Sequence, residues 1–298
     1  MKPAPFDYAA PASLDEVVAT LAEHGDDAKV LAGGQSLVPL LAFRLAAPSV
    51  LVDLNGVAGL EHLRLEGDRL VVGALVRQRT IERLPGLRRR CAMLAEGVAQ
   101  IGHVAIRNRG TVGGSLAHAD PAAEWPALAL ALDGECEVLG PRGRRIVPAE
   151  ALFVSYLTTS LEPDELITEL RLTLPGGKVG STFVELARRH GDFAIAGVGA
   201  MLGLAEDGSV GRSRLVLIGV GERAVRAHRA EALLVGEKPS DELLDEAAAA
   251  VDEAIAPGSD LHGSAEYRRQ VATVLTRRAL AVARARANGK EIGPDGQA

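Results

Sequence analysis

Two short motifs, each with adjacent glycines and a nearby serine, impose the strongest constraint on this chain. They are LAGGQS at residues 31–36 and TVGGS at residues 111–115, about eighty residues apart. Glycine lets a ligand approach backbone N–H groups that a side chain would obstruct. Ser36, Thr111 and Ser115 add hydroxyl donors. The repeated pattern predicts that both segments bind the phosphates of one dinucleotide.

Either glycine pair taken alone is equally typical of a tight turn after a strand. Two sites with matching chemistry favour a diphosphate, which has two phosphates to bind. Other phosphate-binding motifs do not explain the chain, because GxxxxGK[ST] is absent and the string that begins at Gly197 has Leu202 where the third glycine belongs. The pair His118 and Asp120 is too small a set to predict a metal site.

Composition narrows the function further. The net charge is −6 and the basic residues form no long cluster, which argues against nucleic-acid binding. Cys91 and Cys136 are the only two cysteines, too few for an iron–sulfur cluster with its four protein ligands. The sequence shows neither a signal peptide nor an apolar run of membrane-spanning length. We therefore expect a protein of the cytoplasm without a membrane span.

Hydrophobic periodicity and turn signals predict a mixed α+β fold. In the first half we expect helices, strands and hairpins at 13–24 (helix), 28–31 (strand), 37–45 (helix or turn), 49–54 (strand), 62–75 (hairpin), 85–101 (helix), 102–110 (loop), 120–132 (helix capped by Asp120), 134–148 (hairpin) and 164–174 (strand). After a glycine-rich boundary near 174–181 we expect strands at 181–189, 194–205 and 214–220, then helices at about 224–235, 240–255 and 264–287.

The stretches LAGGQSLVPLLAFRLAAPSVLVDLN and IGHVAIRNRGTVGGSLAHADPAAEWPALALAL resemble the medium, FAD-binding subunit of the molybdenum hydroxylases. That family includes carbon monoxide dehydrogenase, xanthine dehydrogenase and bacterial N-heterocycle hydroxylases. The resemblance spans residues 1 to about 285. It implies an FAD-binding domain of the vanillyl-alcohol oxidase / p-cresol methylhydroxylase type over 1–175, with subdomains of about 1–56 and 57–175. A C-terminal flavoprotein domain with a three-stranded sheet and a helix bundle follows over 178–288, and then a loose tail over 289–298.

The resemblance also implies which residues bind FAD non-covalently. Residues 32–36 and 111–115 would bind the diphosphate, Ile101 and Gly102 would lie against the flavin and ribityl chain, and Phe193 would cover the ring. The full implied set is Lys29, Leu31, Ala32, Gly33, Gly34, Gln35, Ser36, Leu37, Ile101, Gly102, Thr111, Gly113, Gly114, Ser115, Ala119, Glu124, Ile167, Asp192 and Phe193. No catalytic side chain and no metal ligand is assigned.

Several of these residues have simpler alternative roles. Glu124 could be a favourable charge in the first turn of a helix, and Ile167 and Phe193 could be core residues. The segment FVEL differs from many relatives, which carry a lysine where Glu185 stands, so a cationic contact to the flavin is in doubt there.

Arg107 and Arg109 could face a phosphate or a partner protein, although a surface ion pair is the default interpretation.

The resemblance implies an electron-transfer subunit. Electrons from a molybdenum-pterin centre on a large subunit would pass through [2Fe–2S] clusters on a small subunit to FAD here, and then to an external acceptor. We expect a heterotrimer, assembled as a dimer of heterotrimers. The alternatives are a self-contained FAD-dependent oxidase or reductase of the same wider fold, and a non-enzymatic nucleotide-binding module. The substrate and the terminal acceptor cannot be read from this chain.

Overall fold

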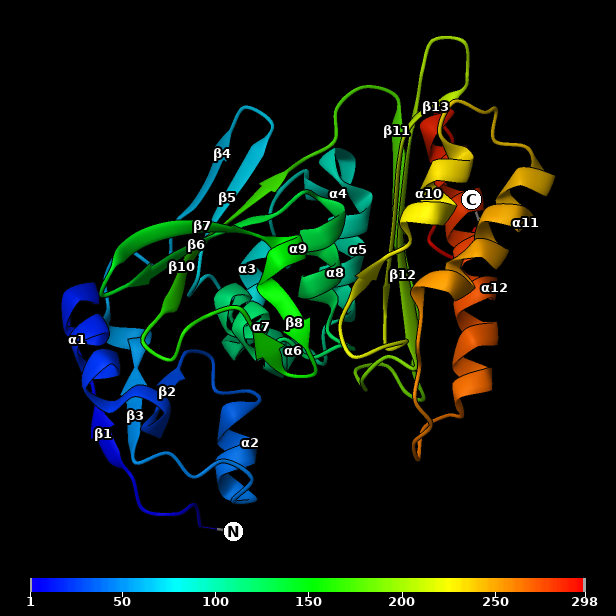
Figure 1. Ribbon diagram of the computed structural model, residues 1–298. Helices are drawn as coiled ribbons and strands as arrows, with labels where there is room; N and C mark the ends of the chain where they lie inside the picture. Colours follow the sequence, from blue (N-terminus) through cyan, green and yellow to red (C-terminus); the bar gives the residue numbers. More distant parts are fainter. Residues whose placement is uncertain (1, 297–298) are drawn as a thin grey trace.

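The computed structural model describes residues 2–296 and arranges three main β-sheets and their helices in sequence order along the molecule (Figure 1). The first part of the chain contains β1 (Asp7–Ala9), α1 (Leu14–His24), β2 (Ala28–Leu31), α2 (Leu37–Ala42) and β3 (Val50–Asp53). The middle part contains β4 (Leu63–Glu66), β5 (Arg69–Gly73), α3 (Gln78–Glu82), α4 (Leu87–Arg90), α5 (Ala92–Gln100), α6 (Val104–Arg109), α7 (Val112–His118), α8 (Glu124–Ala131), β6 (Glu135–Gly140), β7 (Gly143–Pro148), α9 (Ala149–Leu152), β8 (Phe153–Ser155), β9 (Thr158–Thr159) and β10 (Leu166–Thr173). The last part contains β11 (Val179–Leu186), β12 (Ala196–Leu204), β13 (Val210–Ile218), β14 (Val225–Arg226), α10 (His228–Leu234), α11 (Asp241–Ala250) and α12 (Ala265–Ala287).

The first part is a parallel three-stranded sheet in the order β1–β3–β2, with α1 packed against it. The α1 helix begins as expected at Ser13, whose hydroxyl accepts a hydrogen bond from the N–H of Glu16. Its residues Val17 and Leu21 are buried in a small core with the two longer strands. Because β2 and β3 are parallel, the loops after both strands lie at the same edge of the sheet.

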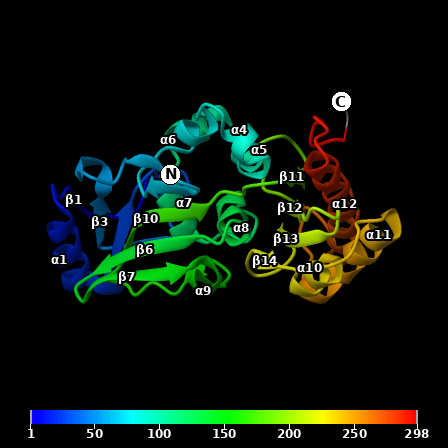
Figure 2. The same cartoon turned by 90° about the horizontal axis from the view of Figure 1, so that it is seen from above.

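The middle part is a five-stranded antiparallel sheet in the order β4–β5–β10–β6–β7. Figure 2 shows this sheet beside α7 and α8. The α8 helix is apolar on all sides, and Trp125 at its start is fully buried, which is typical of a helix inside a core. Small aliphatic residues fill the rest of this core, as the scarcity of aromatic residues requires.

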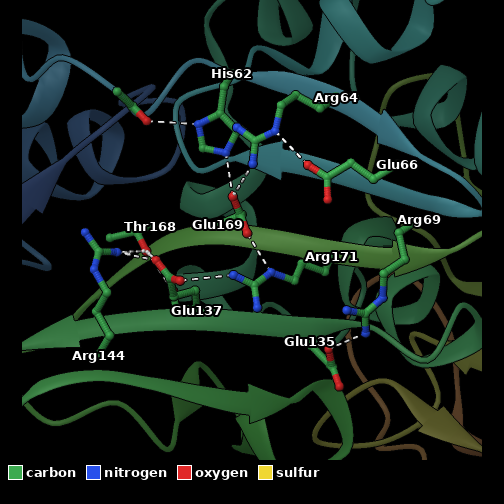
Figure 3. Close-up of polar contacts among 11 residues, drawn as sticks. His62, Arg64, Glu66, Arg69, Glu135, Glu137, Arg144, Thr168, Glu169 and Arg171 are labelled. Atoms are coloured by element: carbon green, nitrogen blue, oxygen red, sulfur yellow. Dashed lines mark hydrogen bonds and ion pairs between the residues drawn. The ribbon is translucent and has the colours of Figure 1, made fainter.

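The other face of this sheet carries alternating arginine and glutamate side chains (Figure 3). Glu169 on β10 accepts hydrogen bonds from His62 and Arg171, and Glu137 on β6 pairs with Arg171 and Arg144. Burial by itself would raise the pKa of Glu169, but the hydrogen bonds from Arg171 and His62 hold this pKa below its usual value. Opposite charges on neighbouring strands stabilise the pairing and give the sheet one apolar and one polar face.

The last part is an antiparallel sheet in the order β11–β12–β13–β14, covered by α10, α11 and α12 (Figures 1 and 2). The three long strands were expected, and the two-residue β14 adds a short fourth. The α12 helix starts at Ser264 as predicted, and Val274 faces solvent rather than the core. No helix within residues 2–296 combines the length and the apolar character needed to cross a bilayer.

Three local predictions were wrong. The helix expected over 85–101 is broken at Cys91, whose backbone is extended, although its apolar residues are buried as expected. The expected loop 102–110 contains the α6 helix. The helix expected from 224 begins only at His228, because the preceding residues pair with β13.

A buried ion pair joins the middle and last parts of the chain. The carboxylate of Glu96 on α5 accepts hydrogen bonds from both terminal nitrogens of Arg286 on α12, at 2.7 and 3.1 Å. It also accepts from the hydroxyl of Thr182 and the N–H of Phe183, both on β11. The side chains of Glu96 and Arg286 are only 5% and 10% exposed, so the pair depends on its partners rather than on water.

We predict that Arg286→Met lowers the free energy of unfolding by about 3 kcal/mol, because it leaves the Glu96 carboxylate buried with only its weaker partners. Urea denaturation of the purified protein measures this change. The matched control is Arg278→Met on an exposed position of the same helix, which should change the free energy little. Equal effects of the two variants would contradict a structural role for the ion pair.

Candidate functional site

The two glycine motifs lie against each other. A β-carbon added at Gly33 would lie 2.4 Å from the carbonyl oxygen of Arg109 and 2.8 Å from the α-carbon of Gly110. A β-carbon added at Gly114 would lie 3.5 Å from that of Ala32. The first approach leaves no room for a side chain at position 33, and the second is an ordinary van der Waals contact, so the two segments pack directly on each other. The structure therefore brings together the two segments that the sequence pattern linked.

A hydrogen-bonded network that sequence analysis missed connects the same two segments. The guanidinium of Arg77 donates to the carbonyl of Arg109 at 2.7 Å and to the side-chain oxygen of Asn55 at 2.7 Å. The amide nitrogen of Asn55 in turn donates to the carbonyl of Ala32 at 3.0 Å. No sequence motif marks Asn55 or Arg77, whose role depends on contacts between distant segments.

The first motif presents unused backbone donors. The N–H groups of Gly33, Gly34, Gln35 and Ser36 donate to no acceptor within residues 2–296. Gly34 has φ +73°, a left-handed conformation that favours glycine. Successive N–H groups of this kind form a concave site for an anion. The loop can thus bind a phosphate without a basic side chain.

The second motif is built differently, because it forms the start of α7. Thr111 caps the helix by accepting a hydrogen bond from the N–H of Gly114, and the N–H of Gly113 donates to the carbonyl of Ala74. A β-carbon at Gly113 would lie 2.5 Å from that of Ala74, so this glycine allows close packing on the middle sheet. The N–H of Ser115 is bonded to the carbonyl of Thr111. This motif therefore contributes close approach and hydroxyl groups rather than free backbone donors.

Arg107 is not a surface residue, contrary to the default interpretation. It is only 4% exposed, and its guanidinium binds the Glu82 carboxylate at 2.7 and 3.1 Å. The same group donates to the carbonyls of Ile101 and Gly102, both at 2.9 Å. Arg107 therefore fixes the turn at Ile101 and Gly102, where Gly102 has φ +47°.

The loop after β11 lies beside that turn. A β-carbon at Gly191 would lie 2.4 Å from the imidazole of His103, so the loop that carries Asp192 and Phe193 contacts the residue directly after Gly102. Phe193 is 68% exposed and is not a core residue. Its side chain is accessible to a ligand or a partner.

The remaining implied site residues lie on several elements. Ile167 is buried on β10, in agreement with a core role for its side chain, while Lys29 on β2 is exposed. Leu31 ends β2 and Leu37 begins α2. Ala119 ends α7 in a left-handed conformation with φ +51°.

The expected helix cap at Asp120 was wrong. Asp120 instead closes a short turn by accepting a hydrogen bond from the N–H of Ala122, and α8 begins at Glu124. Glu124 is therefore in the first turn of α8, as its simpler interpretation required, and it lies near other acidic groups.

Two partly buried carboxyl groups lie on α8 and β11, those of Glu124 and Glu185. Burial raises the pKa of Glu124 well above its usual value, and the negative charges of Glu185 and, more weakly, Asp120 raise it further. A backbone hydrogen bond and the positive charge of Arg107 lower this pKa, but by less. Burial also raises the pKa of Glu185 to about 7. One oxygen of Glu185, Oε2, is buried without a hydrogen-bond partner among residues 2–296. Sequence analysis noted Glu185 only as a departure from relatives.

The chain is similar to known proteins over nearly its whole length. Residues 4–175 match a family model described as the FAD binding domain in molybdopterin dehydrogenase, and residues 181–283 match the CO dehydrogenase flavoprotein C-terminal domain. The chain is 43% identical to the 6-hydroxypseudooxynicotine dehydrogenase complex subunit alpha of Paenarthrobacter nicotinovorans, over 96% of this chain and 97% of that one.

Two solved structures have the same fold over nearly the whole chain. Carbon monoxide dehydrogenase from Hydrogenophaga pseudoflava matches with a TM-score of 0.93 and 38% identity, covering 96% of this chain and 99% of that one. Quinoline 2-oxidoreductase from Pseudomonas putida 86 matches with a TM-score of 0.90 and 39% identity, with the same coverage.

We predict that Glu185→Gln changes the pH dependence of stability. In the wild type, Glu185 binds its proton more tightly in the folded than in the unfolded state, so the free energy of unfolding falls between about pH 4.5 and about pH 7. Glutamine has no such titration. Relative to wild type, the variant should therefore gain on the order of 2–3 kcal/mol between those limits.

Urea denaturation over this pH range measures the effect, with the exposed Glu242→Gln on α11 as the matched control. Parallel stability curves for wild type and Glu185→Gln would contradict the raised pKa.

Proposed function

This chain belongs to the FAD-binding medium subunits of the molybdenum hydroxylases, and we propose that it passes electrons from [2Fe–2S] clusters of a partner subunit through FAD to an external acceptor. The chain is thus an oxidoreductase subunit. The molybdenum-pterin and [2Fe–2S] cofactors of such enzymes are on other subunits.

The observation that carries this proposal is the set of unused N–H groups over residues 33–36, beside the closely packed second motif. These groups fit the diphosphate of FAD, which offers several acceptor oxygens and negative charge, in a chain with no basic cluster at that loop. We therefore assign the diphosphate to the segments 32–36 and 111–115. Leu31 and Leu37 flank the first segment, and Lys29 and Ala119 lie close to the two segments in sequence.

The chain's own residues would position the flavin rather than react. Arg107 keeps the turn at Ile101 and Gly102 in place, and Phe193 is exposed beside it. Glu124 would hydrogen-bond the cofactor, and the backbone of Ile167 would contact the flavin ring. Bound FAD supplies the chemistry, because it can take up and release electrons one or two at a time.

The two cysteines support the need for partner subunits. Burial raises the pKa of Cys91 to about 11 and that of Cys136 to about 12, so neither is a thiolate at neutral pH. A cluster needs four ligands, and this chain therefore depends on a separate [2Fe–2S] protein. We propose a dimer of heterotrimers with that protein and a large molybdenum-binding subunit, located in the cytoplasm. The organic substrate binds on the large subunit.

We predict that Gly33→Ala abolishes FAD binding, because its β-carbon would meet the Arg109 carbonyl at 2.4 Å and push the two motifs apart. The ratio of flavin absorbance to protein absorbance after purification measures occupancy. Gly176→Ala is the matched control, since a β-carbon there has open space around it. Full flavin occupancy in Gly33→Ala would overturn the proposed diphosphate site.

We also predict that the isolated chain with FAD oxidises no organic substrate. Co-expression with the neighbouring coding sequences should yield a complex that contains molybdenum and [2Fe–2S] clusters and reduces this flavin when substrate is added. Turnover by the chain alone would favour the alternative, a self-contained oxidase or reductase.

A further inference from the structure

Hydrogen bonds within the chain fix the backbone orientation of the loop after β2. The unused N–H groups of Gly33, Gly34 and Gln35 each belong to a peptide unit whose carbonyl comes from the preceding residue. A peptide unit is planar and almost always trans, so its N–H and its C=O point in opposite directions. A hydrogen bond that anchors the carbonyl therefore also fixes the direction of the N–H.

Two side-chain amides anchor the first two of these carbonyls. The amide nitrogen of Asn55 donates to the carbonyl of Ala32 at 3.0 Å. The amide nitrogen of Gln35 donates to the carbonyl of Gly33 at 3.1 Å. The N–H groups of Gly33 and Gly34 are thus turned away from these two amides.

The third carbonyl is anchored by the start of α2. The backbone N–H of Val38 donates to the carbonyl of Gly34 at 3.1 Å, which fixes the N–H of Gln35 in the same way. Three successive donors are therefore oriented by the chain itself, around a glycine with φ +73°. Such a run of N–H groups is ready to bind an anion without rearranging.

The amide of Asn55 can face Ala32 in only one orientation. Its oxygen accepts a hydrogen bond from the guanidinium of Arg77 at 2.7 Å, so its nitrogen must face the carbonyl of Ala32 and the carboxylate of Asp53. Arg77 also donates to the carbonyl of Arg109 at 2.7 Å. Arg77 thereby fixes which end of the Asn55 amide meets the first motif.

Core packing does not explain the position of Asn55. The residue is exposed and lies beyond the end of β3, where its amide could form hydrogen bonds with water. Holding an exposed side chain in one conformation costs entropy. A loop that is already ordered in its binding conformation loses less entropy when the ligand binds, and its affinity is higher for that reason.

We propose that Asn55 and Gln35 are positioning residues that preorganise the N–H groups of residues 33–35 for the FAD diphosphate, with Arg77 fixing the Asn55 amide. This inference rests on the proposed function for the identity of the anion. It gives the side chain of Gln35 a role separate from its backbone N–H, which faces the ligand.

The first experiment measures affinity in the full-length chain after removal of FAD. Calorimetric titration with FAD should give a Kd about fivefold higher for Asn55→Ala than for wild type, the effect of one net hydrogen bond. Gln35→Met should raise the Kd in the same direction. The matched control is Asn288→Asp, because the Asn288 amide also donates to a backbone carbonyl at an exposed position, the end of α12. Its Kd should equal that of wild type.

Asn55→Asp separates positioning from charge. This variant loses the donor to Ala32 and adds a negative charge, whose repulsion of the diphosphate is screened by salt. Its Kd should exceed that of Asn55→Ala at an ionic strength of about 0.05 M and approach it at about 0.5 M. The Kd of Asn55→Ala relative to wild type should be the same at both. A wild-type Kd in Asn55→Ala, or in Asn55→Asp at high salt, would overturn the positioning role.

Phosphorus NMR of the FAD-loaded protein distinguishes positioning from a general loss of structure. Asn55→Ala should shift the diphosphate signals of bound FAD and leave the visible absorbance spectrum of the flavin as in wild type. Unchanged phosphorus signals would contradict the inference, and so would equal changes in both spectra.

Titration with inorganic pyrophosphate separates this inference from the proposed function. If wild type binds pyrophosphate more tightly than Asn55→Ala but does not bind FAD, the proposed function fails and the preorganised loop stands. If wild type binds neither, both are wrong. If wild type binds FAD and all variants bind it equally, only this inference is wrong.

Discussion

The close contact of Gly33 with the backbone of Arg109 and Gly110 is the constraint on which the candidate site depends. It brings a loop after a parallel strand against the start of α7, two segments that no helix or sheet joins directly. A β-carbon at position 33 would clash with the carbonyl oxygen of Arg109. The two motifs can lie this close together only because residue 33 is glycine. Arg77 and Asn55 then hold the carbonyls on either side of the contact.

The unused donors follow from the same contact. Residues 33–36 neither continue β2 nor belong to α2, and their N–H groups have no partner within the described part of the chain. In a protein with net charge −6, such donors can bind an anion through local dipoles where overall electrostatics would not attract it. The last part of the chain completes the arrangement, because its loop at Gly191 packs on His103 next to the turn held by Arg107.

Features that depend on neighbouring residues were predictable from the sequence. The helix starts at Ser13 and Ser264 and the identity of the glycine motifs all follow from local chemistry. Features created by tertiary contacts were not. The break at Cys91 interrupts an apolar pattern that still faces the core, so periodicity alone could not detect it.

The site itself shows the same division. The glycine motifs were visible in the sequence, but the burial of Arg107 and the raised pKa values of Glu124 and Glu185 depend on how elements distant in the sequence pack together. A carboxyl group has the same letter whether it faces water or another acid, and only the fold distinguishes the two cases. That is why Glu185 could be recognised as a departure from relatives, whereas its raised pKa could not be predicted.

The ion pair of Glu96 and Arg286 links positions 190 residues apart, and this separation has a consequence during protein synthesis. At a ribosomal speed of roughly 5–20 residues per second, Glu96 is made on the order of ten seconds or more before its partner. Once β11 has been made, the surface that α12 later covers stays open in the nascent polypeptide until α12 follows. The core between β11 and α12 therefore cannot close until the last helix of the chain has been translated.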